Sequence, residues 1–366
     1  MTNLSDSERR AWLRLARTQN VGPVTFAQLV ARFGSASVAL KEVPRLARRG
    51  GGEELRIPSD DDAGRELERL AKIGGRMIAS CEGDFPRGLR ACDPPPPFLS
   101  VLGHASLLAR EMVAVVGARN ASALGRKLAG TLARDLSQAG LVVVSGLARG
   151  IDAAAHDGAL ANGTCAVVAG GVDNIYPPEN TALYEQIRAQ GLIVSEMPLG
   201  QAPQARHFPR RNRIISGLAR GVVVVEASEG SGSLITANFA LEQGREIFAV
   251  PGSPLDPRAK GTNRLIREGA TLTESAEDIL NGLRPILGHD FREPGREGPS
   301  PPGQISEAEA DRIRAKVEEA LGPAPVEVDE LVRLCGAPAA VILIILLELE
   351  LAGRIARHPG NRVSWA

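Results

Sequence analysis

A series of short apolar segments that alternate with amphipathic segments constrains the fold of this chain more than any other feature. The apolar segments predict strands over residues 113–117, 141–145, 165–169, 192–195, 222–225 and 246–250. The amphipathic segments predict helices over residues 122–139, 152–161, 180–190 and 234–243. Strands that are apolar throughout are typical of a parallel sheet that crossover helices cover on both faces. The sequence therefore predicts an α/β fold with a Rossmann-like, doubly wound, mostly parallel sheet over residues 85–283.

Ahead of this sheet, helical periodicity predicts an N-terminal helical domain over residues 1–84. Residues 12–40 hold two helical segments on either side of a turn at Asn20–Thr25. Such a hairpin can present backbone N–H groups to a phosphate, and it can equally be a plain helical connection. Residues 45–64, with a glycine triplet and three aspartates, are interpreted as a loop or solvated surface. Pro94–Pro97 is a stiff, extended lead-in to the sheet.

After the sheet, residues 284–303 are rich in Pro, Gly and charge, which is typical of an unfolded linker. A separate small module follows over residues 304–366. A capping box at Ser306–Glu309 opens its first helix, two more helices are expected over residues 328–335 and 338–351, and a ribbon turns at 359–361. This order matches a winged helix. The third helix is apolar and acidic, which favours a protein contact or a structural role over reading of a DNA groove.

Charge and motif content exclude several classes of site. The 43 basic and 43 acidic side chains cancel, so any affinity for nucleic acid must come from local clusters of arginine. The turn after the first strand lacks the GxGxxG pattern, and no acidic residue closes the second strand, so we expect no nicotinamide, flavin or other cofactor. The four cysteines form no CxxC pair, which argues against a metal site or a disulfide framework and favours reduced thiols.

From the sequence we expect neither a signal peptide nor a membrane span. Its first ten residues are polar and charged, and its longest apolar run, over residues 338–347, falls short of the roughly 20 residues that a bilayer requires. We therefore expect a cytoplasmic protein.

The turns at the carboxyl ends of the predicted strands form the candidate site. Because ligands of open α/β sheets bind outside these ends, the turns at 117–120, 145–150, 170–173 and 226–232 should line one rim. Arg119 in the first turn places a guanidinium beside a helix N-terminus, which suits a phosphodiester; a surface ion pair is the alternative. The turn at Ser231–Ser233 opens a helix whose N–H groups and hydroxyls can hold a phosphate.

A short segment gathers arginines around one aromatic residue, Phe208. Its basic residues are Arg206, Arg210, Arg211 and Arg213. Arginines neutralise phosphates, and one aromatic ring can stack a base for about 1–3 kcal/mol. A single strand fits better than a duplex, because no element here is shaped for a groove. In the alternative interpretation, Phe208 belongs to the core and arginines pair with Glu226, Glu229 or Glu242.

One histidine lies close to the site. His156 is one turn into the helix that follows the second strand, and the sequence offers no serine or cysteine nucleophile with a matching base. We therefore expect a structural histidine and no catalytic residue.

Taken together, the motifs resemble the DprA/Smf family of bacterial DNA-processing proteins. The matching segments are 115–119, 145–156, 169–177, 208–217 and 231–237, with Pro251–Gly252 followed by 261–266. The likeness covers about residues 85–283. Weaker similarity extends to the family's N-terminal SAM-like, or helix-hairpin-helix, domain and to the winged-helix module of some members.

The resemblance implies a dimeric, non-enzymatic recombination mediator. Such a protein protects incoming single-stranded DNA and loads the recombinase RecA onto it during natural transformation, including onto strands coated with single-strand-binding protein. The dimer interface would lie at about Asn263–Leu272. A basic residue that some members carry before the phenylalanine falls near Ala205, which leaves Arg206 as its substitute. The expected DNA-binding residues are Gly117, Arg119, Ser145, Gly146, Arg149, Arg206, Phe208, Arg210, Arg211, Asn212, Arg213, Ser231, Gly232 and Ser233.

An enzyme of a related Rossmann branch is the alternative function. Those enzymes cleave the N-glycosidic bond of nucleoside monophosphates with a glutamate close behind a glycine turn. Here Ile235 and Thr236 follow the turn, and no carboxylate pair lies elsewhere on the rim, which disfavours hydrolysis. If the basic segment is the DNA site, changing Arg211 and Arg213 to Glu should abolish single-strand binding and leave the fold intact.

Overall fold

The computed structural model describes residues 3–52, 54–287, 307–358 and 360–366. It divides into two compact units, one built on residues 65–291 and the other on residues 4–64 together with residues 292–366. The domain boundary that we predicted at residue 84 differs from this division, because strand β1 (Gly75–Ala79) belongs to the sheet of the first unit. Most of the predicted linker, and the capping box at Ser306, lie outside the described residues. Residues 284–287, predicted as linker, instead end helix α12 (Ala276–Leu287).

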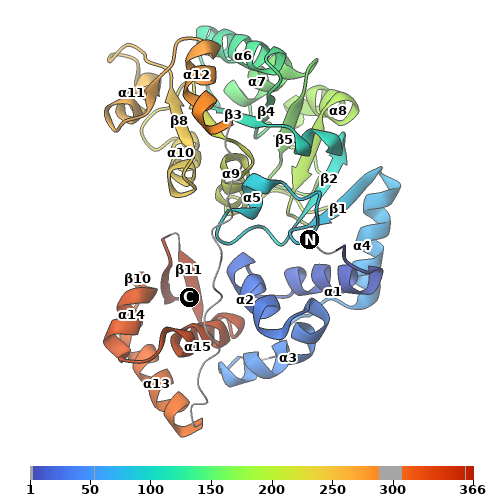
Figure 1. Cartoon of the computed structure of the whole chain (residues 1–366), viewed down its shortest axis with the longest axis vertical. Helices are drawn as coiled ribbons and strands as arrows, with labels where there is room; N and C mark the ends of the chain where they lie inside the picture. Colours follow the sequence, from blue (N-terminus) through green and yellow to red (C-terminus); the bar gives the residue numbers. More distant parts are fainter. Residues whose placement is uncertain (1–2, 53, 288–306, 359) are drawn as a thin grey trace. The chain divides into compact units, whose positions relative to one another are not determined.

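The first unit is built on a nine-stranded sheet with the order β1-β2-β6-β5-β4-β3-β7-β8-β9 (Figure 1). Its parallel strands are β3 (Met112–Val116), β4 (Val142–Ser145), β5 (Thr164–Val167), β6 (Leu192–Ser195), β7 (Gly221–Val224), β8 (Glu246–Ala249) and β9 (Thr271–Leu272). The six predicted strands are all present, and the Rossmann-like sheet is confirmed. β1 and β2 (Phe98–Gly103), which we did not predict, extend one edge by antiparallel pairing.

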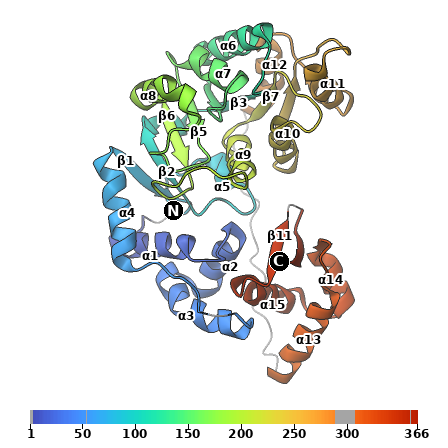
Figure 2. The same cartoon turned by 180° about the vertical axis from the view of Figure 1, so that it is seen from behind.

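Helices cover both faces of this sheet, as the two opposite views show (Figures 1 and 2). On one face lie α6 (Ala123–Gln138), α7 (Ile151–Ala159) and α12, with α8 (Thr181–Gln190) beside α7; on the other lie α9 (His207–Leu218), α10 (Gly232–Glu242) and α11 (Lys260–Arg267). Strand β3 shows why both faces of the sheet are covered. Val113 and Val115 pack with the first group, and Ala114 and Val116 pack with the second, so both sides of an apolar strand are buried.

The second unit begins with α1 (Asp6–Arg17), α2 (Pro23–Phe33) and α3 (Ala36–Arg49). Residues 45–64, which we interpreted as a loop or solvated surface, are helical at both ends, and the charged side chains there are solvent-exposed. Arg45, Arg48 and Arg49 end the amphipathic helix α3, whose other face is buried. The three aspartates form the first turn of α4 (Asp60–Lys72), where the helix dipole favours acidic side chains. Between the two helices, Gly50 and Gly51 form a turn and residues 54–59 have no regular secondary structure, so the loop interpretation holds for this part.

The same unit contains the winged-helix module at the end of the chain. It consists of α13 (Glu307–Ala320), β10 (Val326–Glu327), α14 (Val328–Cys335), α15 (Ala339–Leu351), β11 (Ile355–His358) and β12 (Arg362–Trp365). The three strands pair in the order β10-β12-β11, so the predicted order of helices and hairpin is confirmed, with one additional short strand. Within the described ranges, no single helix is long and apolar enough to cross a membrane. Of the helix pairs in these ranges, only α14 and α15 are together long and apolar enough, and a bend of 117° separates them.

Candidate nucleic-acid interface

The candidate site lies where the strand order reverses. β3 pairs with β4 on one side and with β7 on the other, and open α/β sheets form a crevice at such a switch point. Here the crevice is a cavity of about 560 Å³, which we call the switch-point cavity. The loop after β3, the loop after β7 and the start of α10 line it. Glu226 joins the two loops, because it accepts hydrogen bonds from the Ser122 N–H (2.9 Å) and hydroxyl (2.6 Å).

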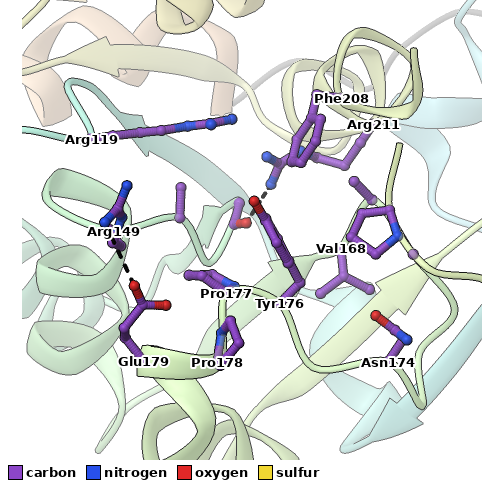
Figure 3. Close-up of a pocket in the computed structure, with 15 residues that line it drawn as sticks. Arg119, Arg149, Val168, Asn174, Tyr176, Pro177, Pro178, Glu179, Phe208 and Arg211 are labelled. Carbon is purple, nitrogen blue, oxygen red and sulfur yellow. Dashed lines mark hydrogen bonds and ion pairs between the residues drawn. The ribbon is translucent and has the colours of Figure 1, made fainter. Parts of the chain in front are cut away.

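A second cavity, of about 220 Å³, adjoins the first (Figure 3). We call it the tyrosine cavity, because the half-exposed ring of Tyr176 forms part of its wall. The residues that line both cavities are Arg119, Ala148, Phe208 and Arg211. All four turns that we expected at the rim contribute to one cavity or the other, so the prediction of a common rim is confirmed.

Arg119 is exposed in the loop after β3. Its guanidinium carbon lies 5.0 Å from the centroid of the Phe208 ring, which is a cation–π distance. Among the described residues Arg119 makes no ion pair, so the alternative interpretation as a surface ion pair does not hold. The Tyr176 ring also packs against the Phe208 ring, and the two ring centroids are 5.9 Å apart. A cation and two aromatic rings therefore face the space where the cavities meet.

The basic residues of the segment around Phe208 lie on different faces of helix α9, which we did not predict from the sequence. Phe208, Arg211, Asn212 and Ile215 line the switch-point cavity, and their spacing is that of one helix face. Arg206, Arg210 and Arg213 line neither cavity. We had expected Arg206, Arg210 and Arg213 to contact DNA together with Phe208 and Arg211, because we had not recognised the 3.6-residue period of this segment.

Arg213 and Arg210 instead contact a carboxylate that we had not considered. Arg213 forms a hydrogen-bonded ion pair with Glu196, and Arg210 Nε lies 3.8 Å from the same side chain. The Glu196 side chain is only 9% exposed, so this is a largely buried contact. The expected alternative of arginines paired with glutamates was right in kind, but the partner of Arg213 is Glu196.

Arg211 is buried at the wall between the cavities. Its Nη1 donates to the carbonyl oxygens of Gly146 and Val167, the latter at 2.9 Å, while Nε has no hydrogen-bond partner among the described residues. Burial lowers the pKa of Arg211 to about 10, opposed by the nearby Asp152 carboxylate. The side chain therefore stays charged at neutral pH, and it links α9 to the ends of β4 and β5.

A buried network fixes the turn between β4 and α7. Asp152 accepts hydrogen bonds from the N–H groups of Gly146 (3.1 Å) and Ala148 (3.3 Å), and His156 Nε2 accepts one from Leu147 (3.3 Å). These bonds hold Leu147 at a φ of 56°, a left-handed conformation that side chains rarely adopt. Burial raises the pKa of Asp152, opposed by Arg211, and lowers the pKa of His156 to about 3.

His156 is therefore neutral and structural, as expected. Asp152 lies in the first turn of α7, whose N-cap is Gly150. The expected contact Ser145 also turns inward, because its hydroxyl donates to the carbonyl of Val115 at 2.7 Å and it lines neither cavity.

The turn at Ser231–Ser233 lies at the switch-point cavity as expected. Ser231 is the N-cap of α10 and its hydroxyl lies 2.8 Å from that of Ser233. Asn212 fixes this turn to α9 by donating to the Gly232 carbonyl at 3.2 Å. The N-terminus of α10, which is electropositive and carries free N–H groups, therefore faces the cavity.

The structure adds residues that the sequence analysis did not assign. Tyr176 and Asn174 line the tyrosine cavity, and Arg258 lines the switch-point cavity while paired with Asp256 at 2.9 Å. Tyr176 could have been found, since it lies in a motif that we had already matched. Nothing in the sequence around Arg258 indicated this position. Arg149, which we did predict, lines the tyrosine cavity 3.6 Å from Glu179.

The described residues hold no group of three or more His, Cys, Asp or Glu side chains that could bind a metal ion.

Comparisons with known proteins agree with the resemblance in all parts of the chain. The family model for DNA recombination-mediator protein A matches residues 76–284, the model for a DprA-like N-terminal HHH domain matches residues 6–68, and the model for the DprA winged helix domain matches residues 299–361. Protein Smf of Synechocystis is 33% identical over 98% of this chain and 99% of its own length. Protein Smf of Escherichia coli is 41% identical over 96% of this chain and 94% of its own length.

Solved structures show the same fold. DNA processing protein A of Streptococcus pneumoniae is 30% identical, covers 80% of this chain and 100% of its own, and has a TM-score of 0.64. DNA processing protein A of Helicobacter pylori, whose structure is described in terms of a single-stranded DNA binding mode, is 29% identical, covers 58% of this chain and 96% of its own, and has a TM-score of 0.53. The chain belongs to the DprA/Smf family of DNA-processing proteins.

Proposed function

We propose that this chain is a recombination mediator that holds single-stranded DNA in the two adjoining cavities. The observation that supports this most directly is the exposed, unpaired Arg119 guanidinium stacked on Phe208 at the wall that the cavities share. The relative from Helicobacter pylori, whose structure is described by its single-stranded DNA binding, supports the same ligand.

The two cavities suit different parts of a strand. The N–H groups and hydroxyls at the start of α10, with Arg119 and Arg258, offer the switch-point cavity donors and positive charge for phosphates. Phe208 offers an aromatic face to a base, and Arg119 can exchange its cation–π contact for a phosphate. Of the expected contact residues, ten line a cavity: Gly117, Arg119, Gly146, Arg149, Phe208, Arg211, Asn212, Ser231, Gly232 and Ser233.

The wider role follows from the family. We propose that the protein protects incoming single strands in the cytoplasm and loads RecA onto them during natural transformation, including strands that carry single-strand-binding protein. We also propose a homodimer through about Asn263–Leu272. β9 is an edge strand of the sheet, and Leu272 on it is 48% exposed, which are properties of a surface that pairs with another chain.

Catalysis is not part of the proposal. Of the described residues that line the two cavities, Asp152 is hydrogen-bonded to backbone N–H groups and Glu179 lies beside Arg149. Neither is placed as a free acid or base next to a glycine turn. Release of free base from nucleoside monophosphates would overturn this part of the proposal.

A titration with labelled oligo-dT and with a duplex of equal length tests DNA binding. We expect preference for the single strand and an affinity that falls steeply as salt rises, because phosphate contacts release counterions. Duplex preference, or affinity independent of salt, would contradict the proposal. RecA loading is a separate measurement: the protein should shorten the lag before RecA filaments form on strands coated with single-strand-binding protein.

A further inference from the structure

The last turn of α15 packs closely against the end of α3 within the second unit (Figure 2). A Cβ atom at Gly50 would lie 2.1 Å from the carbonyl oxygen of Glu348, and one at Gly52 would lie 2.7 Å from the Cα of Ala352. Both distances are far below van der Waals contact. The backbones of the N-terminal and C-terminal modules therefore touch at a place that admits only glycine.

Polar groups connect the same two surfaces. The Asn20 side chain, in the turn between α1 and α2, donates to the carbonyl of Leu351 at 3.1 Å. Glu348 is 1% exposed and forms a hydrogen-bonded ion pair with Arg314 of α13, while Arg49 Nε of α3 lies 3.7 Å from its other oxygen. Because a buried carboxylate is costly without partners, arginines from both modules stabilise this charge.

This contact also indicates a role for α15, the third helix of the winged-helix module. α15 contains no Lys, Arg or Asn, and most of its side chains are buried. Its C-terminal turn faces the hairpin turn of the N-terminal module, where we had considered a phosphate contact.

We propose that the winged-helix module docks in cis on the N-terminal helical module through Glu348–Gly353, so that the two ends of the chain act as one body. The partner of the third helix is then the segment Arg48–Gly52 with Asn20, and neither the helix nor the hairpin turn is available to DNA in the docked state. This proposal does not depend on the proposed function, and its test uses no DNA.

Hydrogen exchange of the full chain carrying Gly50→Ala tests the docking. Gly50 has φ −75° and ψ −2°, which alanine adopts readily, so the main obstacle to the methyl group is the Glu348 carbonyl. We expect amides of residues 348–354, in the other module, to exchange about tenfold faster, as overpacking opens the contact. Gly64→Ala is the matched control, because the nearest atom to its Cβ is Arg10 Cδ at 3.9 Å.

The reciprocal variant distinguishes undocking from local damage. Ala352→Leu alters the other side of the contact, since a Gly50 Cβ would lie 3.1 Å from the Ala352 Cβ, and it should accelerate exchange at residues 46–52. If each variant affects only its own module, the modules are not docked and the proposal fails. Protection of these segments that depends on protein concentration would assign the contact to a second copy of the chain and overturn docking in cis.

Discussion

The Arg211 guanidinium donates a hydrogen bond to the carbonyl oxygen of Gly146, and thereby links helix α9 to the turn after β4. The approach is so close that a Cβ at Gly146 would lie 1.8 Å from Nη1. Arg211 therefore stabilises the walls of both cavities before it contacts any ligand. Its neighbours on α9 differ from it, because helical geometry directs Arg210 and Arg213 toward Glu196.

Changing Arg211 to Glu should destabilise the protein rather than remove DNA binding alone. The substitution places a carboxylate among buried carbonyl oxygens and near Asp152, and loss of one partner in a buried charged network costs about 3–5 kcal/mol. Urea unfolding followed by circular dichroism measures the loss. Arg210→Gln is the control, since the Arg210 side chain is 47% exposed and the change should alter the free energy of unfolding by about 1 kcal/mol or less. Equal stability of Arg211→Glu and the unaltered protein would refute the claim that Arg211 stabilises the cavity walls.

Arg213→Gln should leave single-strand affinity within about twofold of the unaltered protein, because Arg213 lines neither cavity and its guanidinium is paired with Glu196. The measurement is an oligo-dT titration at one fixed salt concentration. A large loss of affinity with an intact fold would restore Arg213 to the DNA site that we expected from the sequence.

Phe208→Leu should weaken single-strand binding by about 5- to 150-fold, the equivalent of the about 1–3 kcal/mol that one base–aromatic stack contributes. Leucine keeps apolar contact and loses the aromatic face. Phe33→Leu, a change of the same kind in the second unit, serves as the control. Full affinity after Phe208→Leu would mean that no base stacks on this ring.

His156 should make stability depend on pH in the acid range. Burial lowers its pKa to about 3 from the usual 6.5, so between these values the unfolded chain binds a proton that the folded chain does not. The free energy of unfolding should therefore rise with pH from about 3 to 6.5, by up to about 1.4 kcal/mol per pH unit, and the contribution is complete above 6.5.

His156→Gln removes this dependence. Comparison of its unfolding curves with those of the unaltered protein isolates the histidine from Asp152, whose raised pKa acts with the opposite sign. Parallel pH profiles for the two proteins would show that His156 is not held neutral by the fold.

The sheet could be predicted because its signal is local. Each central strand is an unbroken apolar run, and the pattern itself requires cover on both faces. β1 and β2 escaped notice because polar residues break their apolar runs: Arg76 interrupts β1, which is the edge strand, and Ser100 interrupts β2. The start of α4 at Asp60 was not predicted for another reason. Three consecutive aspartates indicate an exposed segment, but they are equally compatible with a loop and with the first turn of a helix.

The site could be predicted by segment but not by side chain. The positions of Arg119 and the Ser231–Ser233 turn follow from strand ends alone. In α9 the same residue types have different roles, because direction around the helix decides whether an arginine meets the cavity, Glu196 or buried carbonyl groups. Glu196 itself lies outside every motif that we had matched, so its pairing with Arg213 could not be read from the sequence.

The most direct test of the DNA site is the affinity of Arg119→Glu for labelled oligo-dT, compared with Arg134→Glu. Both arginines are exposed, and neither makes an ion pair among the described residues, but Arg134 lies on α6 and lines neither cavity. The two variants carry the same change in net charge. We predict that Arg119→Glu loses nearly all single-strand binding while Arg134→Glu retains it. Equal affinities for the two variants would contradict the assignment of the cavities as the DNA site.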